Sequence, residues 1–575
     1  MKHAQDTVDV VISGLGPTGM TLAHLLGQRG LKVLVLEREP QFYGNARAVY
    51  TDDECLRIFQ SMGVAQELAN DMLQDTIVQL VLKDGSVLAQ IIDSKRPYGW
   101  SSSNFFYQPL LETTLAKTLN RYPLVEVRRG REVISFAQDA EGVTVQHAAT
   151  EGLQYGKTSA TETITGAKPQ VQSNDAQQVR AKYFVACDGG RSIVRAQLGI
   201  DMTGKSFPNP WLVVDIKAKD PLNGLHHLPY FNFICDPICP TVSCVQPYGH
   251  HRFEFMLMPG QTREYMEDPA TIRNLLSRHV DVEKFDILRC LVYTFNALIA
   301  SKWREGRIFL AGDAAHMTPQ FIGQGMNAGV RDAYNLAWKL SAVLKGRAGE
   351  KLLDTYQSER HPHVRDMIKT AVDLKNFVSL ANPPLAFIRN ILTRVAMATP
   401  KLGTFIREGN FIPQPYYQNG SYLGLPRARR KAAAGRLLPQ PSMRCADGKP
   451  RMLDDLLGNG FALIGLGVDP RAALSFYDLA FWELQEARFI IAYPFGSRPQ
   501  HRVSHTAAQG IHVAEDISGE LYTWLIDHDA AQGDVVIIRP DRFVFGVVHT
   551  SNLTSATQTV ANQLHCSETV QEASL

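Results

Sequence analysis

Two glycine-containing motifs, about 300 residues apart, carry the residue types that could bind a nucleotide. The first, Gly14-Leu15-Gly16-Pro17-Thr18-Gly19, directly follows the apolar run VDVVIS, and the second, Gly312-Asp313-Ala314-Ala315-His316, follows RIFLA. Glycines let a phosphate approach the backbone, and an aspartate accepts hydrogen bonds from sugar-type hydroxyls. Since no catalytic triad or metal-ligand pattern accompanies them, we expect a bound nucleotide cofactor to carry the chemistry.

The first motif has the GxGxxG spacing of a dinucleotide-binding turn. Gly14 permits the turn, Gly16 admits a pyrophosphate, and Gly19 lets the following helix pack on the strand. The N-terminus of that helix offers free N–H groups and a partial positive charge. Glu37 comes 18 residues after Gly19, at the end of the next apolar run, where an acid can accept hydrogen bonds from a ribose.

The second motif distinguishes FAD from NAD. Asp313 follows a strand, and its carboxylate suits the ribityl hydroxyls that FAD has and NAD lacks. Gly323 and Gly325 then allow a close approach, and a predicted helix runs to about Lys345. The N-terminus of this helix could face the pyrimidine edge of the isoalloxazine, where reduced flavin carries negative charge.

The elements that must position these motifs follow from apolar periodicity. Residues 8–13 and 31–36 are short apolar runs with a helical pattern between them, which predicts a β-α-β unit. Residues 203–304 alternate apolar and polar side chains, as in HRFEFMLM, which predicts an inserted antiparallel sheet. The polar stretch 148–178 is expected to form a long surface loop. From about residue 451 a small separate α/β domain follows a basic, proline-bearing linker.

Composition excludes several classes of protein. Of 575 residues, 45% are hydrophobic and 20% charged, and a formal net charge of +2 gives no reason to expect a nucleic-acid partner. No apolar run approaches the ~20 residues of a membrane span, and the N-terminus does not resemble a signal peptide. The eight cysteines include no CxxC pair, so we expect free thiols and a cytoplasmic location.

Two further stretches could have other roles. Cys235, Cys239 and Cys244 lie near histidines, but their spacing fits no zinc pattern, so we predict buried cysteines and no metal. The amphipathic stretch PPLAFIRNILTRVAMATPKL is predicted to pack against other helices rather than to bind a membrane.

The chain resembles the single-component FAD-dependent aromatic hydroxylases of the para-hydroxybenzoate hydroxylase type. Three ordered motifs carry this resemblance: the two above and Cys187-Asp188-Gly189-Gly190-Arg191-Ser192. A closer likeness is to the 3-(3-hydroxyphenyl)propionate hydroxylases, in the stretches YGWSSSNFFYQPLLE, NPWLVVDI, RFEFMLMPG, GQGMNAGVRDAYNLAWKL and VVIIRPDRFV. The loop 148–178 looks like an insertion relative to that group. The run Gln320-Phe321-Ile322 also departs from the expected sequence, which bears on the substrate and not on the cofactor.

The resemblance implies an α/β fold with a Rossmann-like FAD-binding domain, an inserted antiparallel-sheet substrate domain and a C-terminal thioredoxin-like domain. The expected boundaries are 1–75, 105–202 and 300–360 for the FAD-binding domain, 76–104 and 203–299 for the substrate domain, 361–420 for a helical segment, 421–450 for a linker and 451–575 for the thioredoxin-like domain. Without CxxC this last domain cannot exchange disulfides, so we expect a structural or dimer-interface role within a homodimer.

The resemblance also implies roles for individual residues. Arg47 would reach the pyrophosphate, Gln108 would hydrogen-bond the cofactor, and Asp188 would lie behind the pyrophosphate. Arg195 would be either a nicotinamide-cofactor contact or a surface charge. The full predicted cofactor-binding set is Gly14, Gly16, Pro17, Thr18, Gly19, Glu37, Arg38, Arg47, Gln108, Asp188, Gly312, Asp313, Pro319, Gly323, Gly325, Met326 and Asn327.

The implied activity is hydroxylation of a phenol. NADH or NADPH would reduce FAD, O2 would add at flavin C4a, and the distal oxygen of the hydroperoxide would pass to the ring. 3-(3-Hydroxyphenyl)propionate or 3-hydroxycinnamate would give a catechol. Gln320, Arg252, Tyr230 and His250 are candidates for the substrate pocket, although each could instead belong to the sheet surface or its packing. The alternatives are a hydroxylase or epoxidase of a bulkier phenol, an FAD-dependent dehydrogenase or reductase without oxygen transfer, and a non-enzymatic flavoprotein.

Overall fold

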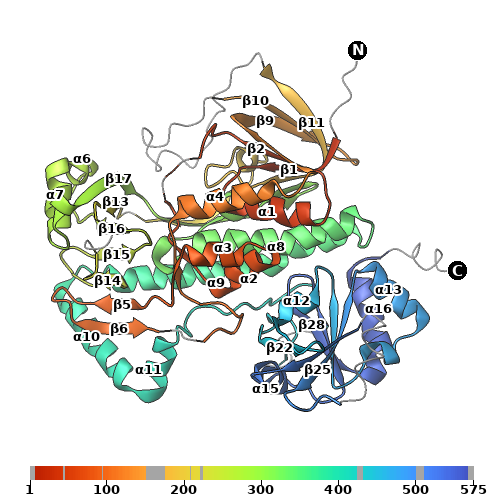
Figure 1. Ribbon diagram of the computed structural model, residues 1–575. Helices are drawn as coiled ribbons and strands as arrows, with labels where there is room; N and C mark the ends of the chain where they lie inside the picture. Colours follow the sequence, from red (N-terminus) through yellow and green to blue (C-terminus); the bar gives the residue numbers. More distant parts are fainter. Residues whose placement is uncertain are drawn as a thin grey trace. The chain divides into compact units, whose positions relative to one another are not determined.

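The protein forms two compact units (Figure 1). The computed structural model describes residues 7–42, 44, 46–92, 95–150, 175–207, 209–220, 225–423, 432–499 and 511–566. Unit 1 comprises Met1–Lys95, Ser101–Ala333 and Val364–Gln414. Unit 2 comprises Arg96–Trp100, Tyr334–His363 and Pro415–Leu575. Most of the predicted loop 148–178, namely 151–174, lies outside the described residues.

An eight-stranded sheet forms the nucleotide-binding half of unit 1. Its main path runs β19-β20-β11-β1-β2-β8, with β10 and β9 continuing from β11. The strands are β1 (Thr7–Ser13), β2 (Val33–Glu37), β8 (Val125–Arg129), β9 (Arg131–Gln138), β10 (Val143–Ala149), β11 (Gln177–Ala186), β19 (Arg304–Glu305) and β20 (Ile308–Leu310). The strands β20, β11, β1, β2 and β8 are parallel, and burial on both faces explains the continuous apolar runs of β1, β2 and β20. The predicted β-α-β unit is therefore confirmed.

The carboxyl ends of β1, β11 and β20 bring the three motifs to one edge of this sheet. Cys187 donates its N–H to the Ser13 carbonyl at 2.7 Å, and Ala311 donates to the Ala186 carbonyl at 2.9 Å. Helix α1 (Pro17–Gln28) follows β1, and helix α8 (Gln324–Leu344) follows the motif after β20. Helix α4 (Gln108–Leu119) packs beside α1.

The second sheet of unit 1 has seven strands in the order β17-β13-β16-β15-β14-β5-β6. They are β5 (Val78–Val81), β6 (Val87–Ile91), β13 (Trp211–Ala218), β14 (Phe231–Ile234), β15 (Thr241–Val245), β16 (His250–Met256) and β17 (Phe285–Tyr293). Neighbours are antiparallel except β14 and β5. The predicted antiparallel insertion is thus present.

The two faces of this sheet have different surroundings. One face carries Leu212, Val214, Phe253 and Phe255, and packs under helices α6 (Arg263–Glu267) and α7 (Pro269–Ser277). The opposite face, called here the inner face, carries Trp211, Phe233, Val242 and Met256 from four different strands. Period-two alternation along each strand produces this division.

Helix α10 (Pro383–Ala398) buries its polar side and exposes its apolar side. Its buried residues are Ala386, Arg389 and Thr393, and the Arg389 guanidinium donates to the carbonyls of Phe377 at 2.9 Å and Cys235 at 3.2 Å. The large apolar side chains of α10 and of α11 (Pro400–Arg407) are therefore exposed: Leu385, Phe387, Ile388, Ile391, Leu392, Val395, Leu402 and Phe405. Within the single chain these large apolar side chains do not pack against other helices, and the predicted packing of the stretch against helices is not seen for them.

Unit 2 is built on a mixed sheet in the order β23-β22-β26-β25-β24-β27-β28. Its strands are β22 (Ser442–Cys445), β23 (Pro450–Met452), β24 (Ala462–Leu466), β25 (Arg488–Pro494), β26 (Ile511–Asp516), β27 (Asp534–Ile538) and β28 (Val544–His549). Its helices include α12 (Leu453–Leu457), α13 (Phe476–Leu484), α15 (Glu520–Asp527) and α16 (Leu553–Gln563). Because β22 begins at Ser442, the sheet starts inside the predicted linker 421–450. A thioredoxin-like assignment stays a prediction.

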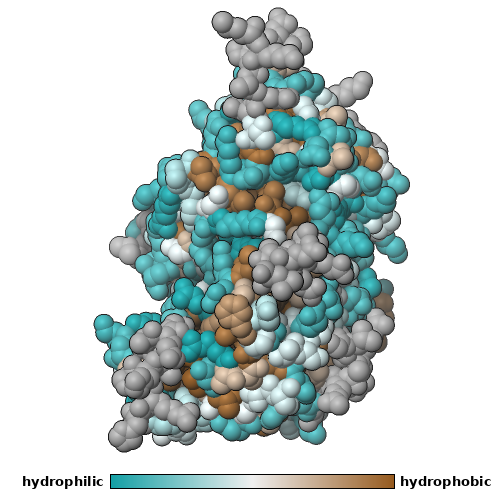
Figure 2. Space-filling model, turned by 90° about the vertical axis from the view of Figure 1, so that its right-hand side faces the viewer, coloured by the Kyte–Doolittle hydropathy of each residue, from teal (hydrophilic) through white to brown (hydrophobic). Residues whose placement is uncertain are grey.

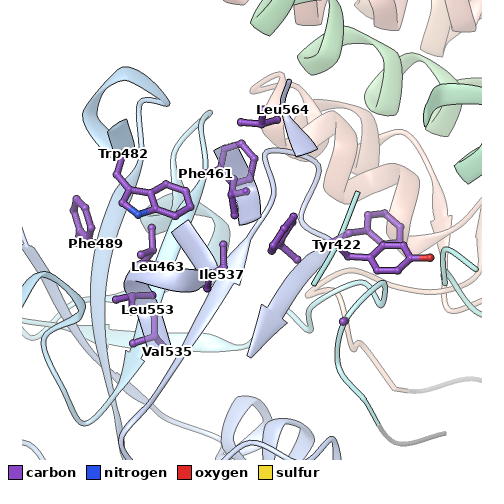
Figure 3. Close-up of a cluster of buried hydrophobic side chains, with 14 of the residues drawn as sticks. Tyr422, Phe461, Leu463, Trp482, Phe489, Val535, Ile537, Leu553 and Leu564 are labelled. Carbon is purple, nitrogen blue, oxygen red and sulfur yellow. The ribbon is translucent and has the colours of Figure 1, made fainter. Parts of the chain in front are cut away.

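A hydrophobic core joins this sheet to α13 and α16 (Figure 3). Phe461, Leu463, Trp482, Ile537 and Leu553 lie together in it, and all are buried. Residues from the C-terminal half of α8, including Trp338, belong to the same core.

Buried charges also lie inside unit 2. The Glu359 carboxylate of α9 (Thr355–Val378) accepts from Lys339 Nζ at 2.7 Å and from Arg539 at 2.7 and 2.8 Å. Arg539 also pairs with Asp541 at 2.7 Å. All four side chains are at most 1% exposed, so two cations and two anions compensate each other without solvent.

Hydrophilic residues cover most of the molecular face shown in Figure 2, and hydrophobic residues gather there in small patches. Within the described ranges no helix has the length and apolar character that a bilayer crossing requires.

Candidate functional site

The glycine loop after β1 has the geometry expected of a pyrophosphate cradle. Gly14 has φ +102°, and a Cβ there would lie 2.3 Å from the Cys187 carbonyl oxygen. A Cβ at Gly19 would lie 2.0 Å from the Gly14 carbonyl oxygen. By contrast, a Cβ at Gly16 would meet nothing within 4 Å. The first and third glycines therefore serve the protein's own packing, and the second keeps a space open.

The N-terminus of α1 faces the same loop. Gly16 is its N-cap and Pro17 its first residue, and no side chain caps the free N–H groups. Thr18 packs against the other motif: a Cβ at Gly312 would lie 2.6 Å, and one at Gly329 2.2 Å, from Thr18 Oγ1. Residues about 300 positions apart thus meet at one helix end, whose partial positive charge suits a phosphate.

Glu37 braces the loop at the end of β2. Its Oε2 accepts the Leu15 N–H at 2.6 Å and its Oε1 the Glu39 N–H at 2.9 Å. Arg38 next to it pairs with Glu39 at 3.5 Å. The predicted contacts of Glu37 and Arg38 with a ribose region stay predictions.

Asp188, after β11, has an unsatisfied oxygen. Its Oδ2 accepts the Val194 N–H at 3.4 Å, whereas its buried Oδ1 has no hydrogen-bond partner in the described part of the chain. Burial raises the pKa of this carboxyl group. Arg195 is buried and donates to the carbonyls of Ala314 at 3.0 Å and Gly190 at 2.8 Å. It therefore ties the Asp188 motif to the Asp313 motif and is not the surface charge that one alternative predicted.

The turn after β20 presents Asp313 outward. Gly312 donates its N–H to Asp332 Oδ2 at 3.1 Å, and His316 Nε2 contacts the same oxygen at 2.6 Å. Asp332 and His316 are fully buried, whereas Asp313 is exposed. Asp332 thus fixes the turn from inside, and the Asp313 carboxylate is left available for a ligand.

The start of α8 is fixed by contacts with strand β3 (Tyr50–Thr51). Gly323, with φ +63°, fits against the Tyr50 ring, where a Cβ would come within 2.6 Å. Asn327 is buried: its Oδ1 accepts from Thr51 Oγ1 at 3.0 Å and its Nδ2 donates to the Gly323 carbonyl at 3.2 Å. Gly325 and Met326 are partly buried, and Pro319 is buried. The predicted cofactor contacts of these residues stay predictions.

A buried ion cluster, which the sequence did not reveal, supports the same turn. Arg331 of α8 contacts Glu54 at 2.5 Å and Asp52 at 2.5 Å, both at the start of α2 (Asp53–Ser61). Gln324 donates to Asp52 at 3.0 Å. A spacing of seven residues on α8 links Gln324 and Arg331, but nothing in the sequence identified their partners.

Gln108 holds the segment that carries Arg47. Its Oε1 accepts the N–H groups of Arg47 at 2.6 Å and Ala48 at 2.7 Å, and its Nε2 donates to Glu112 at 2.6 Å. Gln108 therefore positions the Arg47 backbone. The Arg47 residue itself is exposed, so its side chain can extend to a phosphate.

The four substrate-pocket candidates have different environments. Arg252 is 2% exposed and donates to Asp215 at 2.6 Å and to the carbonyls of Ala46 and Arg47. His250 is buried and stacks on Tyr107 at 3.9 Å. Tyr230 is exposed, and Gln320 donates to Glu254. A direct substrate contact stays a prediction for all four, although every nitrogen of the Arg252 guanidinium is already engaged.

The inner face next to these residues is aromatic, which sequence reasoning missed. The Phe321 ring lies 5.3 Å from Trp211, 6.5 Å from Phe233 and 5.7 Å from Phe295. The Trp211 indole N–H is buried among them without a hydrogen-bond partner. Alternation in HRFEFMLM did mark Glu254 as facing the same way as Arg252, but it could not show that this face meets the turn at Gln320.

The residues present fit an extended dinucleotide that carries a polar sugar chain next to its pyrophosphate. The open space at Gly16 and the helix end fit a pyrophosphate, and Asp188 Oδ1 lacks a partner behind it. Exposed Asp313 fits the hydroxyls further along the cofactor. The fold and this site define an FAD-binding flavoprotein.

Comparisons with known proteins agree with this class. The family described as FAD binding domain matches residues 7–371, and the HcaD C-terminal domain matches residues 435–563. The 3-(3-hydroxy-phenyl)propionate/3-hydroxycinnamic acid hydroxylase of Burkholderia cenocepacia is 37% identical over 94% of each chain. The enzyme of that name from Comamonas testosteroni is 34% identical over 98% of each chain.

A solved structure has the same fold. The flavin-dependent monooxygenase PieE, in complex with FAD and substrate, superposes with a TM-score of 0.77 at 22% identity, over 97% of this chain and 99% of that chain. The chain therefore belongs to the family of FAD-dependent aromatic hydroxylases that includes the 3-(3-hydroxyphenyl)propionate hydroxylases. The predicted fold class, FAD dependence and monooxygenase class are confirmed.

Proposed function

We propose that this hydroxylase converts 3-(3-hydroxyphenyl)propionate or 3-hydroxycinnamate to the corresponding catechol, using O2 and NADH or NADPH. The observation that carries the proposal is 37% identity, over 94% of both chains, to a relative named for these substrates. The aromatic inner face beside the Gln320 turn supports it, since flat rings pack favourably against a substrate ring. We place the reaction in the cytoplasm, where reduced nicotinamide is available and the eight free thiols remain reduced.

The protein's own residues bind, orient and exclude water. The α1 N-terminus and Arg47 would hold the pyrophosphate, Asp313 would hold the ribityl chain, and the α8 N-terminus would lie near the flavin ring. When bound, FAD takes a hydride from NAD(P)H and supplies one oxygen atom of O2 to the aromatic ring. The inner face keeps the phenol ring in an apolar setting, which prevents loss of the oxidant to water.

A substrate screen tests the proposed function. The purified flavoprotein should oxidise NADH or NADPH slowly alone, and at least about 10-fold faster with 3-(3-hydroxyphenyl)propionate, since ring binding is expected to gate reduction. Mass spectrometry after reaction under ¹⁸O2 should show one labelled oxygen in the catechol. If bulkier phenols alone stimulate oxidation, the substrate assignment is wrong. If no phenol incorporates label, the enzyme is a reductase without oxygen transfer.

We also propose that the enzyme is a homodimer formed through the exposed apolar face of α10 and α11. The eight large side chains on this face are each 43–65% exposed. Together they offer an area comparable with the roughly 800 Å² that each partner buries in a standard interface. A second copy related by a twofold axis presents the same apolar stripe, which makes the face self-complementary.

The double variant Ile388→Glu/Leu392→Glu is expected to be monomeric, because two charges per copy would have to be buried in the interface. Light scattering after size exclusion should show half the wild-type mass. Ile526→Glu, at a 62% exposed position of unit 2, is the matched control and should leave the mass unchanged. A monomeric wild type, or a double variant that stays dimeric, would refute this interface. Co-sedimentation of wild type with phospholipid vesicles would assign the face to a membrane instead.

The predicted structural or dimer-interface role of the C-terminal domain stays a prediction. Removing everything after Met443 would not test it cleanly, since that cut lies within β22. It would also remove Arg539, the partner of buried Glu359. Substitutions of exposed residues on the C-terminal domain, with the mass measured in solution, are therefore a better test of its role in the dimer.

A further inference from the structure

Glu254 is a buried carboxyl group in the middle of a sheet. It lies on β16 opposite Val213 of β13 and Val242 of β15, and it is 4% exposed. Arg252 shares its inner face, and Arg289 is on the same face of β17, but both arginines pair with Asp215. Among the described residues no cation forms an ion pair with Glu254. A buried acid without a cation is costly in a purely structural role.

The hydrogen-bond partner of Glu254 comes from the flavin side of the site. Gln320 Nε2 donates to Glu254 Oε2. Gln320 is seven residues after Asp313, in the turn between the Asp313 motif and α8, and it is partly exposed. The amide thus holds the carboxylate where the substrate sheet meets the turn that is expected to flank the flavin ring.

The surroundings of Glu254 suit an aromatic ligand with one polar atom. Next to Gln320 in the chain, Phe321 packs with Trp211, Phe233 and Phe295. Trp211, 0% exposed, has an indole N–H without a partner. This donor is free to pair with a polar atom of a ligand or with an ordered water.

We propose that Glu254, oriented by Gln320, accepts the proton of the substrate's ring hydroxyl. This rests on the proposed function and assigns a residue to it. The phenol O–H bond breaks, the proton forms an O–H bond with the Glu254 carboxylate, and the electron pair stays on the phenolate oxygen. The ring becomes electron-rich enough to accept oxygen at the adjacent carbon. When aromaticity is restored, that carbon loses its own proton to solvent, and Glu254 returns the first proton to the oxygen.

The protonation behaviour of Glu254 agrees with this role. Burial raises its pKa to about 7, partly offset by Arg252 and Arg289, while Asp215 adds to the rise. Further titratable groups on or against this face are His250 of β16, Cys244 of β15, Lys217 of β13, Tyr293 of β17 and Tyr107, which stacks on His250. A pKa near neutrality lets the group both take and return a proton at working pH.

The test compares Glu254→Gln with wild-type holoenzyme, using 3-(3-hydroxyphenyl)propionate. The amide keeps the shape and a hydrogen bond but cannot take a proton, so kcat should fall about 100-fold, with KM changed less than about 3-fold. When kcat of the wild type is plotted against pH, its rising limb should lie near pH 7. In the variant it should move toward the phenol's own pKa of roughly 10. Glu254→Asp should restore part of the rate.

Two measurements separate this role from a structural one. At pH 8 the ultraviolet difference spectrum of bound substrate should show phenolate with wild type and neutral phenol with Glu254→Gln. The pKa of Glu254 in the folded state lies above the ordinary 4.5. The stability that protonated Glu254 contributes is therefore lost as the pH rises from about 4.5 to 7. Glu254→Gln should therefore be at least as stable as wild type at pH 8, whereas removing a structural carboxylate would destabilise.

Glu267→Gln is the matched control, because Glu267 lies on α6 against the opposite face, where it accepts the Val292 N–H at 3.0 Å. Its pH profile and spectrum should match wild type. An unchanged limb near pH 7 and phenolate formation in Glu254→Gln would overturn this inference while leaving the proposed function intact. A wild type that neither binds nor hydroxylates phenols would overturn both.

Discussion

The Gly16→Val variant is expected to fold like wild type and to bind flavin far more weakly. Gly16 has φ −76° and ψ 179°, an extended conformation open to any residue, and a Cβ there meets no protein atom within 4 Å. A valine side chain would occupy the space through which a pyrophosphate approaches the loop. We expect FAD affinity to fall at least about 100-fold, equivalent to about 2.7 kcal/mol. The ratio of absorbance at 450 and 280 nm measures flavin content, and a thermal melt of the apoproteins measures folding.

Gly19→Ala provides the contrast, since its Cβ would come within 2.0 Å of the Gly14 carbonyl oxygen. This variant should lose stability as well as flavin. Asp313→Ala, at an exposed position, should keep its fold and lose colour or turnover. Full flavin content in both Gly16→Val and Asp313→Ala would refute the placement of the cofactor between the two motifs.

Replacing Glu359 by Gln is expected to destabilise unit 2 by about 3–5 kcal/mol, because one anion fewer leaves a net positive charge in a buried cluster. Glu359 is 0% exposed and contacts both Lys339 and Arg539 at 2.7 Å. Burial alone would raise its pKa, but Arg539 and Lys339 hold the pKa well below the ordinary 4.5. Its stabilising contribution is therefore present above pH 4.5 and lost as the pH falls below it. Urea unfolding followed by tryptophan fluorescence measures the change.

Asp447→Asn is the control for this measurement. Asp447 pairs with Arg451 at 2.6 Å on the surface of the same unit, with both side chains more than 40% exposed. Such solvent-exposed pairs contribute little to stability. Equal effects of the two substitutions would show that the buried cluster does not stabilise unit 2.

The sequence predicted those parts of the site that backbone geometry dictates. The GxGxxG turn can be recognised in the sequence because Gly14 and Gly19 have no room for a Cβ. These steric constraints recur wherever a β-α-β unit binds a dinucleotide. Asp313 was recognisable from its place after an apolar strand. Period-two alternation likewise predicted the inserted sheet and the facing of Arg252 and Glu254.

What the sequence did not predict depends on contacts between distant segments. The sequence allowed Arg195 to be a surface charge, whereas in the structure it donates hydrogen bonds to the Gly190 and Ala314 carbonyls. Arg331 gave no sign of Asp52 and Glu54, some 280 positions away. The orientation of helix α10 was also not predictable from its own sequence. Its apolar stripe predicts burial, but the Arg389 hydrogen bonds to Phe377 and Cys235 decide which side faces in.

Helix α8 begins just after the turn that carries Gln320 and Gly323 and ends in the core that contains Trp338, with the boundary between the two units falling after Ala333. Its hydrogen-bonded turns form cooperatively, so order at one end favours order at the other. We therefore expect a substitution in the Trp338 core to loosen the first turns of the same helix, and so to weaken cofactor retention at a distance from the chemistry.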